Sequence, residues 1–267
     1  MSKIEVLVTS MHQKDTSKYE KMNLQGDAVI ANQADDCFYV EEQKGEHTVK
    51  MITTNTRGTS INRNLAIMYS NAEYVIFSDD DQVFVDGYEQ IIEDEFKKCP
   101  KADAIKFYCE STNKKRPLSF KQPSRLKRVG KKEIMSAGVH LLAIKRQFLL
   151  DSHLSFQINM GPGKEIYCGE DSAFLSDFIE SKGKIYVSPK LLGYVEQTDS
   201  SWFEGITERY LNAMGYVYAR IYGKLAILAI YRRAYKLRKK VNNFNLLQMI
   251  KLMKKGMKQQ RVKGQKC

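Results

Sequence analysis

The sequence predicts an α/β fold in which helices flank a mainly parallel sheet, followed by a basic helical C-terminal region. Short β-rich runs recur at intervals that leave room for helices, and the positive charge is concentrated near the C-terminus. With 267 residues, 43% of them hydrophobic, the chain can bury one large core and a small appendage. We therefore expect a main domain over residues 1–208 and a basic amphipathic region over residues 209–267.

The first part of the chain alternates between expected strands and helices. The strands are Ile4–Thr9, Asp27–Ala31, Thr48–Thr53 and Glu73–Ser78. Helices are expected over Ser17–Leu24 and Ser60–Tyr69. Ligands bind open α/β sheets beyond the carboxyl ends of the strands. We therefore expect a site after the last of these strands, where the chain continues as Asp79-Asp80-Asp81.

The rest of the main domain is less regular. Residues 109–132 are polar, basic and interrupted by Pro117 and Pro123, which indicates a long loop. After this loop we expect a strand over Val139–Ile144, a helix over Asp171–Ser181 and a strand over Lys184–Val187.

The three adjacent aspartates suggest a divalent metal. Neighbouring carboxylates raise one another's pKa unless a cation lies among them. Mg²⁺ is held by one or two carboxylates together with substrate phosphates, and Mn²⁺ accepts similar ligands. The alternative is an exposed acidic turn with no ligand. The position directly after an apolar strand favours the metal.

The order of five segments resembles glycosyltransferase family 2. They are VLVTSMH, VIANQAD, RGTSINRNLAI, YVIFSDDDQVF and GEDSAFL, and the resemblance covers about residues 4–205. It implies a GT-A fold and a nucleotide-sugar donor. In that family the aspartates after the strand form the DxD motif. By position, Asp80 would bind the ribose, Asp81 would hold the metal that bridges the donor diphosphate, and Asp79 is a neighbour whose role is open.

The resemblance also implies further contacts with the donor. Thr9, Gln33 and Asp35 match positions that hold the base and ribose, and Arg57 and Arg63 match basic positions near the phosphates. Other interpretations remain open. Asn32-Gln33-Ala34-Asp35 is also an ordinary turn after a strand, and either arginine could be a solvated residue on a helix face.

The Gly169-Glu170-Asp171 step supplies the second group of acids. Displacement at an anomeric carbon needs a carboxylate that takes the proton from the acceptor hydroxyl. By resemblance we assign this general base to Asp171 and place Glu170 against the acceptor. Both acids could instead favour the start of a helix through its dipole, and the two roles are compatible. Trp202 could form a platform for the acceptor sugar or pack in the core.

The tail differs in charge from the body. Residues 209–267 contain 16 Lys or Arg and no acid, which leaves 27 bases against 31 acids before them. The longest apolar run, Leu225–Tyr231, is far shorter than the ~20 residues that span a bilayer. Apolar positions recur at helical spacing with lysines on the other side, which predicts an interfacial amphipathic helix; they are Leu246, Met249, Ile250, Met253 and Met257.

Two settings are considered for the tail. The first is an anionic membrane, and the alternative is a helix that packs its Met/Leu face on the catalytic domain. Nucleic acid is not expected, since no base-reading module is present. The N-terminal sequence lacks the pattern of a signal peptide and the five cysteines show no paired spacing. We therefore expect a cytoplasmic protein at the inner face of the membrane.

These expectations combine into one function. The chain is expected to be an inverting glycosyltransferase that uses Mn²⁺ or Mg²⁺ and a nucleoside-diphosphate sugar, with UDP as the expected nucleotide. Its acceptor would be a saccharide or lipid-linked saccharide in surface-polysaccharide synthesis. The alternatives are a nucleotidyltransferase, which would release pyrophosphate, and a non-catalytic membrane-binding protein.

Overall fold

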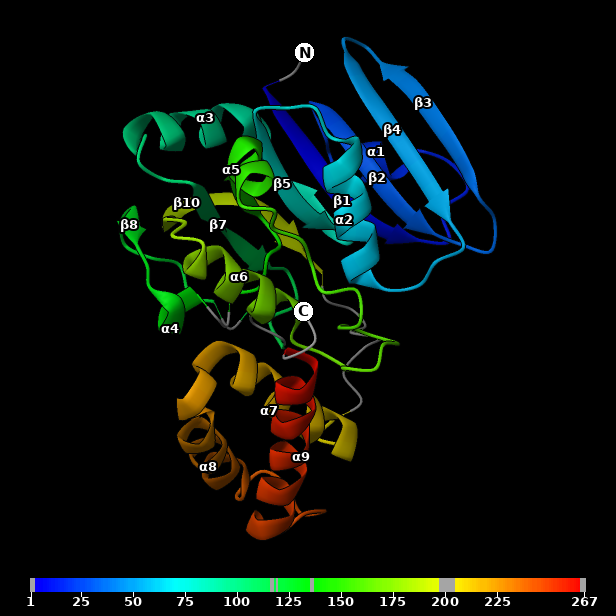
Figure 1. The fold of residues 1–267 in the computed structure, drawn as a ribbon. Coiled ribbons are helices and arrows are strands. Elements are labelled where there is room, and N and C mark those ends of the chain that lie inside the picture. The colour runs from blue at the N-terminus through cyan, green and yellow to red at the C-terminus, as the bar shows by residue number, and fades with distance from the viewer. Residues whose placement is uncertain (1–2, 116–117, 119, 135–136, 197–204, 265–267) are drawn as a thin grey trace. The chain divides into compact units, whose positions relative to one another are not determined.

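The computed structural model describes residues 3–115, 118, 120–134, 137–196 and 205–264 (Figure 1). The chain forms two compact units. The first comprises Met1–Phe156 and Phe174–Asp199, and the second comprises Gln157–Ala173 and Ser200–Cys267. The second unit therefore includes a segment from the middle of the sequence as well as the residues after the expected boundary at 208.

The first unit is built on one sheet. Its strands are β1 (Ile4–Met11), β2 (Asp27–Gln33), β3 (Phe38–Lys44), β4 (His47–Thr54), β5 (Tyr74–Asp79), β6 (Gln82–Phe84), β7 (Ala104–Ser111), β8 (Lys127–Arg128), β9 (Leu142–Lys145) and β10 (Ile185–Val195). Their order is β3-β4-β2-β1-β5-β9-β7-β10-β6, and β8 pairs with β10. The neighbours β4, β2, β1 and β5 run parallel, as do β7 and β10. The predicted α/β class with a parallel central sheet is confirmed.

Helices cover both faces of this sheet (Figure 1). They are α1 (Lys18–Lys21), α2 (Thr59–Tyr69), α3 (Tyr88–Lys98), α4 (Lys131–Ile134), α5 (Arg146–Asp151) and α6 (Glu170–Glu180). Alternate residues of β1 point to opposite faces. Val6 and Val8 pack with residues of α1 and α3, whereas Leu7 packs with residues of α2, α5 and α6. Both faces of β1 are therefore buried, as its apolar run Val6-Leu7-Val8 indicates.

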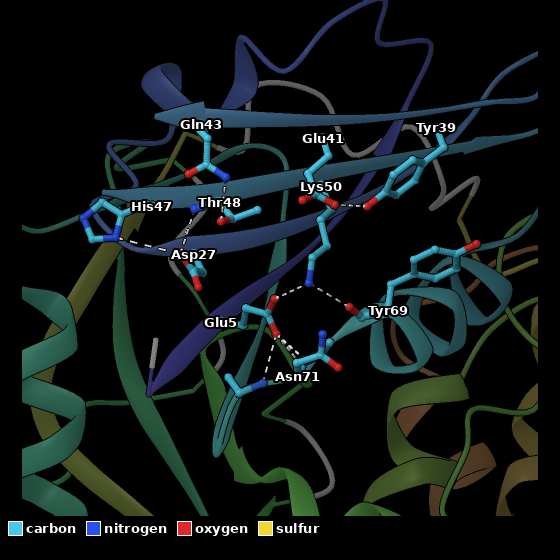
Figure 2. A network of polar contacts seen from close by, with 12 residues as sticks. Glu5, Asp27, Tyr39, Glu41, Gln43, His47, Thr48, Lys50, Tyr69 and Asn71 are labelled. Atoms are coloured by element: carbon cyan, nitrogen blue, oxygen red, sulfur yellow. Dashed lines mark hydrogen bonds and ion pairs between the residues drawn. The ribbon is translucent and has the colours of Figure 1, made fainter. Parts of the chain in front are cut away.

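A buried carboxylate ties the start of β1 to the connection between α2 and β5 (Figure 2). Glu5 is 3% exposed. It accepts hydrogen bonds from the backbone N–H groups of Asn71 (2.8 Å) and Ala72 (3.2 Å), and Lys50 Nζ lies 3.3 Å from its carboxylate. The charge of Glu5 is thus matched by one cation and fixed backbone donors.

Replacement of this carboxylate tests its role in stability. We expect Glu5→Ala to lower the free energy of unfolding by about 3 kcal/mol, because loss of one member of a buried pair leaves the other uncompensated. Chemical denaturation would measure it. Asp94→Ala is the control, since Asp94 pairs with Lys97 at the exposed surface of α3 and should leave stability nearly unchanged. Equal effects of the two substitutions would contradict the assignment.

Several elements were not expected from the sequence. The segment 109–132 was predicted to be a long loop, but its first residues complete β7 and it also contains β8 and the start of α4. The charged residue Lys106 interrupts the apolar pattern of β7, although it is fully buried. The hairpin of β3 and β4 was also missed, because β3 is an edge strand whose side chains are mostly exposed.

The second unit contains α7 (Glu208–Tyr222), a 3₁₀ turn (Gly223–Leu225), α8 (Ala226–Leu237) and α9 (Leu246–Gly264). Helices α7 and α9 touch through their backbones. A Cβ atom added to Gly215 of α7 would lie 1.8 Å from the carbonyl oxygen of Met253, and one added to Gly256 of α9 would lie 1.8 Å from that of Asn212. Only glycine allows this approach.

The apolar stripe of α9 lies inside this helical unit. Met249 and Met253 are fully buried, Ile250 and Met257 are each 7% exposed, and all four belong to a core shared with α7 and α8. The prediction that this stripe enters a membrane is therefore wrong, because its side chains are buried against α7 and α8. No helix of the described residues is long and apolar enough to cross a bilayer.

Candidate active site

The parallel strands bring their carboxyl ends to one edge of the sheet. Thr9 of β1 lies opposite Asp79 of β5, Met11 of β1 lies opposite Gln33 of β2, and Gln33 lies opposite Thr54 of β4. The sequence-predicted residues Thr9, Gln33 and Asp79 are therefore gathered at the expected place.

Asp79 is held by a neutral donor and a cation. Thr9 Oγ1 donates to Asp79 Oδ1 at 3.2 Å, and Arg63 Nη2 lies 3.3 Å from the same oxygen. The Arg63 side chain is only 5% exposed, and its guanidinium lies 5.2 Å from the centre of the Phe156 ring. Arg63 is therefore a buried partner of the aspartate cluster and not a solvated residue on a helix face.

Asp80 has partners that the sequence did not suggest. Ser10 Oγ donates to its carboxylate, and Lys18 Nζ lies 3.6 Å from the carboxylate and donates to its backbone carbonyl at 3.0 Å. Ser10 follows Thr9 at the end of β1, so its position was a usable signal. Nothing in the sequence pattern pointed to Lys18, which starts the short helix α1.

Gln82 shapes the turn that carries the aspartates. Its side chain is 2% exposed, and Oε1 accepts hydrogen bonds from Ser78 Oγ (2.8 Å) and from the backbone N–H of Asp79 (3.3 Å). These hydrogen bonds connect the two ends of the turn between β5 and β6. Asp80 and Asp81 consequently occupy a fixed turn.

Asp81 differs from its two neighbours. Its pKa is raised to about 6, chiefly by partial desolvation, then by the negative charges of Asp79 and Asp80. A backbone hydrogen bond and Lys18 lower the pKa, but less than the other causes raise it. The residue as a whole is exposed, so solvent reaches it although its carboxyl group is partly desolvated. The ionised form of Asp81 is thus short of positive charge.

The end of β2 organises the loops around this edge. The Gln33 side chain accepts a hydrogen bond from the N–H of Gly58 at 2.8 Å, just before α2. Asn32 is fully buried and exchanges hydrogen bonds with the backbone of Gln13 at 2.9 and 3.0 Å. Both amides therefore hold loop backbone in this structure. The expected role of Gln33 in binding the base stays a prediction.

Asp35 and Arg57 form an exposed pair. Arg57 also donates to the backbone carbonyls of Ala34 and Thr56. The Asp35 side chain is 89% exposed and that of Arg57 is 45% exposed. Asp35 follows β2 and Arg57 follows β4, so they could meet a ligand at the rim of the site, but the structure does not pair Arg57 with the three aspartates.

The second unit contains the other pair of acidic residues, Glu170 and Asp171. Gly169 has a φ of 95°, and a Cβ atom there would lie 2.4 Å from Val217 Cγ2 of α7. Glu170 and Asp171 follow in the first turn of α6, both partly buried. Their place at a helix N-terminus agrees with a role in helix stability. The roles of Asp171 as the general base and of Glu170 as a contact to the acceptor stay predictions. Trp202 lies outside the described residues.

Comparison with known proteins shows the fold. No family model matches the chain, and no curated protein matches it in sequence. Among solved structures, S. aureus TarS residues 1–349 in complex with UDP-GlcNAc matches with a TM-score of 0.64 at 13% identity, over 89% of this chain and 73% of that one. The same protein in complex with UDP gives 0.62 at 13% identity, over 89% and 72%. The TarS fold is the GT-A fold that the family 2 resemblance implied. The chain has the GT-A fold.

The three aspartates of this turn were expected to include a metal ligand. Among the residues that the structure describes, no three His, Cys, Asp or Glu side chains form a metal-binding group. The donor set nevertheless fits Mg²⁺ or Mn²⁺, which take few protein carboxylates and complete their shell with phosphate oxygens and water. Asp81 has the charge deficit that such a cation would correct, whereas Asp79 and Asp80 already have cationic partners.

Proposed function

We propose that this protein is a metal-dependent glycosyltransferase that takes a sugar from a nucleoside-diphosphate sugar. UDP is the proposed nucleotide, because the GT-A structures of TarS that resemble this chain contain UDP-GlcNAc and UDP. The observation that carries the proposal is the division of roles among three adjacent aspartates. Two have cationic partners within the protein, and the third has a raised pKa at an open edge of the sheet.

The residues of this edge suggest how the donor is bound. Asp81 would hold Mn²⁺ or Mg²⁺, and the ion when bound would neutralise the leaving diphosphate. Asp80 is held in place by Ser10 and Lys18, so its carboxylate would be positioned to accept hydrogen bonds from the ribose hydroxyls. Arg63 holds Asp79 in place and contributes positive charge close to the cluster. Arg57, Asp35, Gln33 and Thr9 complete the proposed donor contacts.

The acceptor side of the proposal rests on Asp171. Its carboxylate would take the proton from the acceptor hydroxyl as that oxygen attacks the anomeric carbon from the face opposite the diphosphate, which inverts the configuration. Glu170 and Trp202 would contact the acceptor. We propose a saccharide acceptor, in its lipid-linked form in surface-polysaccharide synthesis, and a cytoplasmic location at the inner face of the membrane.

A thermal-shift screen with product analysis would test the function. We expect UDP-sugars to raise the melting temperature only with Mn²⁺ or Mg²⁺, and turnover to release UDP. A ligand at about 100 times its Kd stabilises a fold by about 2.7 kcal/mol. Release of pyrophosphate would identify a nucleotidyltransferase instead. The absence of any metal-dependent nucleotide binding would favour a non-catalytic protein.

A further inference from the structure

The outer face of α8 exposes large apolar side chains. Leu228, Tyr231 and Tyr235 are 65%, 47% and 59% exposed, and Leu225 in the preceding turn is 64% exposed. On the opposite side of the helix Ala226, Ile230, Ala234 and Leu237 are buried in the core of the second unit. The helix is thus apolar on both sides, and only one side is covered by the described protein.

Exposed cations lie on the same face. Leu228, Arg232 and Lys236 follow one another at intervals of four residues, and Tyr231, Tyr235 and Lys239 do the same. Residues four apart are neighbours on a helix surface, so Leu228, Arg232 and Lys236 adjoin Tyr231 and Tyr235 on α8, and Lys239 follows in the exposed turn after the helix. We call Leu225, Leu228, Tyr231, Arg232, Tyr235, Lys236 and Lys239 the α8 surface.

Charge and chemistry together indicate the partner. Residues 209–267 contain no acid, so the α8 surface is complementary to an anionic partner. Leucine, tyrosine and basic side chains on one face are typical of helices that lie at a membrane interface. A nucleic acid would match the cations and tyrosines but would leave Leu225 and Leu228 in water. A bilayer accommodates all three kinds of side chain.

We propose that the α8 surface docks the protein on an anionic lipid bilayer. The two leucines and two tyrosines enter the boundary between headgroups and acyl chains, while Arg232, Lys236 and Lys239 contact lipid phosphates. This assigns membrane contact to α8 in place of the apolar stripe of α9, which is buried. The proposal does not depend on the donor chemistry, because its test measures lipid binding alone.

Two triple variants with the same net charge test the electrostatic part. Arg232→Gln, Lys236→Gln and Lys239→Gln remove three cations from the α8 surface. Lys251→Gln, Lys255→Gln and Lys258→Gln remove three exposed cations from α9. Binding of the full chain would be measured by co-sedimentation with vesicles of equal parts phosphatidylglycerol and phosphatidylcholine, and with phosphatidylcholine alone.

We expect the unmodified protein to bind the anionic vesicles and not the neutral ones. A basic residue at a membrane surface contributes up to about fivefold in affinity, so the α8 triple variant should lose up to about 100-fold and the α9 triple variant far less. The binding should also weaken between about 0.1 M and about 1 M salt, as the screening length falls from about 10 Å to about 3 Å. Equal losses in the two variants would overturn the α8 assignment.

A double variant tests the apolar part. Leu225→Ser with Leu228→Ser should weaken vesicle binding by about tenfold or more, because each side chain leaves an apolar environment. Met68→Ser is the control, since Met68 is 75% exposed on α2 in the first unit. Unchanged melting temperatures would show that all variants remain folded. No vesicle binding by the intact protein, or binding to RNA that the α8 substitutions abolish while vesicle binding persists, would overturn the proposal.

Discussion

Asp81→Asn is expected to abolish metal-dependent binding of UDP while slightly raising the melting temperature of the ligand-free protein. The two effects have one cause. The pKa of Asp81 is raised from 3.8 to about 6, so its ionised form destabilises the folded state at neutral pH; this cost declines as pH falls below about 6 and is gone below the ordinary pKa of 3.8. An amide removes the cost but provides no charge for the metal. Because Asp81 is partly open to solvent, the gain in stability should be small.

Thermal shifts with and without Mn²⁺ and UDP would measure both effects. For a chain of this size, loss of about 2.7 kcal/mol of ligand stabilisation corresponds to roughly 5–10 °C. Asp86→Asn is a matched control on the same segment. Hydrogen bonds from Asn23 and Gln25 lower the pKa of Asp86, so this substitution should lower stability slightly and leave UDP binding intact. A full Mn²⁺-dependent shift in Asp81→Asn would exclude Asp81 as the metal ligand.

Asp171→Asn is expected to cut turnover by about 10²–10⁴ while leaving donor binding nearly unchanged, the usual result of losing a general acid–base group. Asparagine keeps the size of the side chain at the start of α6 but cannot accept the proton. Steady-state kinetics and calorimetry with UDP would separate the two effects.

Two further measurements distinguish catalysis from helix stability. Asp177→Asn lies on the same helix and should leave turnover unchanged. A loss of turnover in Asp171→Asn without a lower melting temperature would support the role of a base. Near-normal turnover would show that Asp171 only stabilises the start of α6, and Glu170 would then be the next candidate for the general base.

The sequence was sufficient to predict the strand ends where Thr9, Gln33 and Asp79 meet, because apolar runs followed by polar residues are local features. It was not sufficient to predict that Lys18 and Ser10 hold Asp80, since these contacts join residues more than 60 positions apart. Periodicity carries no information on such pairs. Gln82 was missed for another reason, since its partners Ser78 and Asp79 are only four and three positions away, but the adjacent aspartates drew attention to charge and not to the turn.

The tail shows a different limitation. The amphipathic pattern of α9 was real, but a pattern does not say what covers the apolar side. Packing on a membrane and packing on α7 require the same spacing of Met249, Met253 and Met257, and the structure shows the second. The exposed leucines and tyrosines of α8 were equally visible in the sequence, and only the burial of the opposite face distinguishes them.

The contact between Gly215 and Gly256 has a practical consequence for protein engineering. Because the backbones of α7 and α9 touch there, α9 is an integral part of its unit and not a detachable extension. An expression clone that stops before Leu246 would lose a core helix and uncover α7, on which Gly169 rests through Val217. Loss of activity after such a truncation would report damage to the unit that carries Asp171. Point substitutions on α8 are therefore the sound way to separate lipid binding from catalysis.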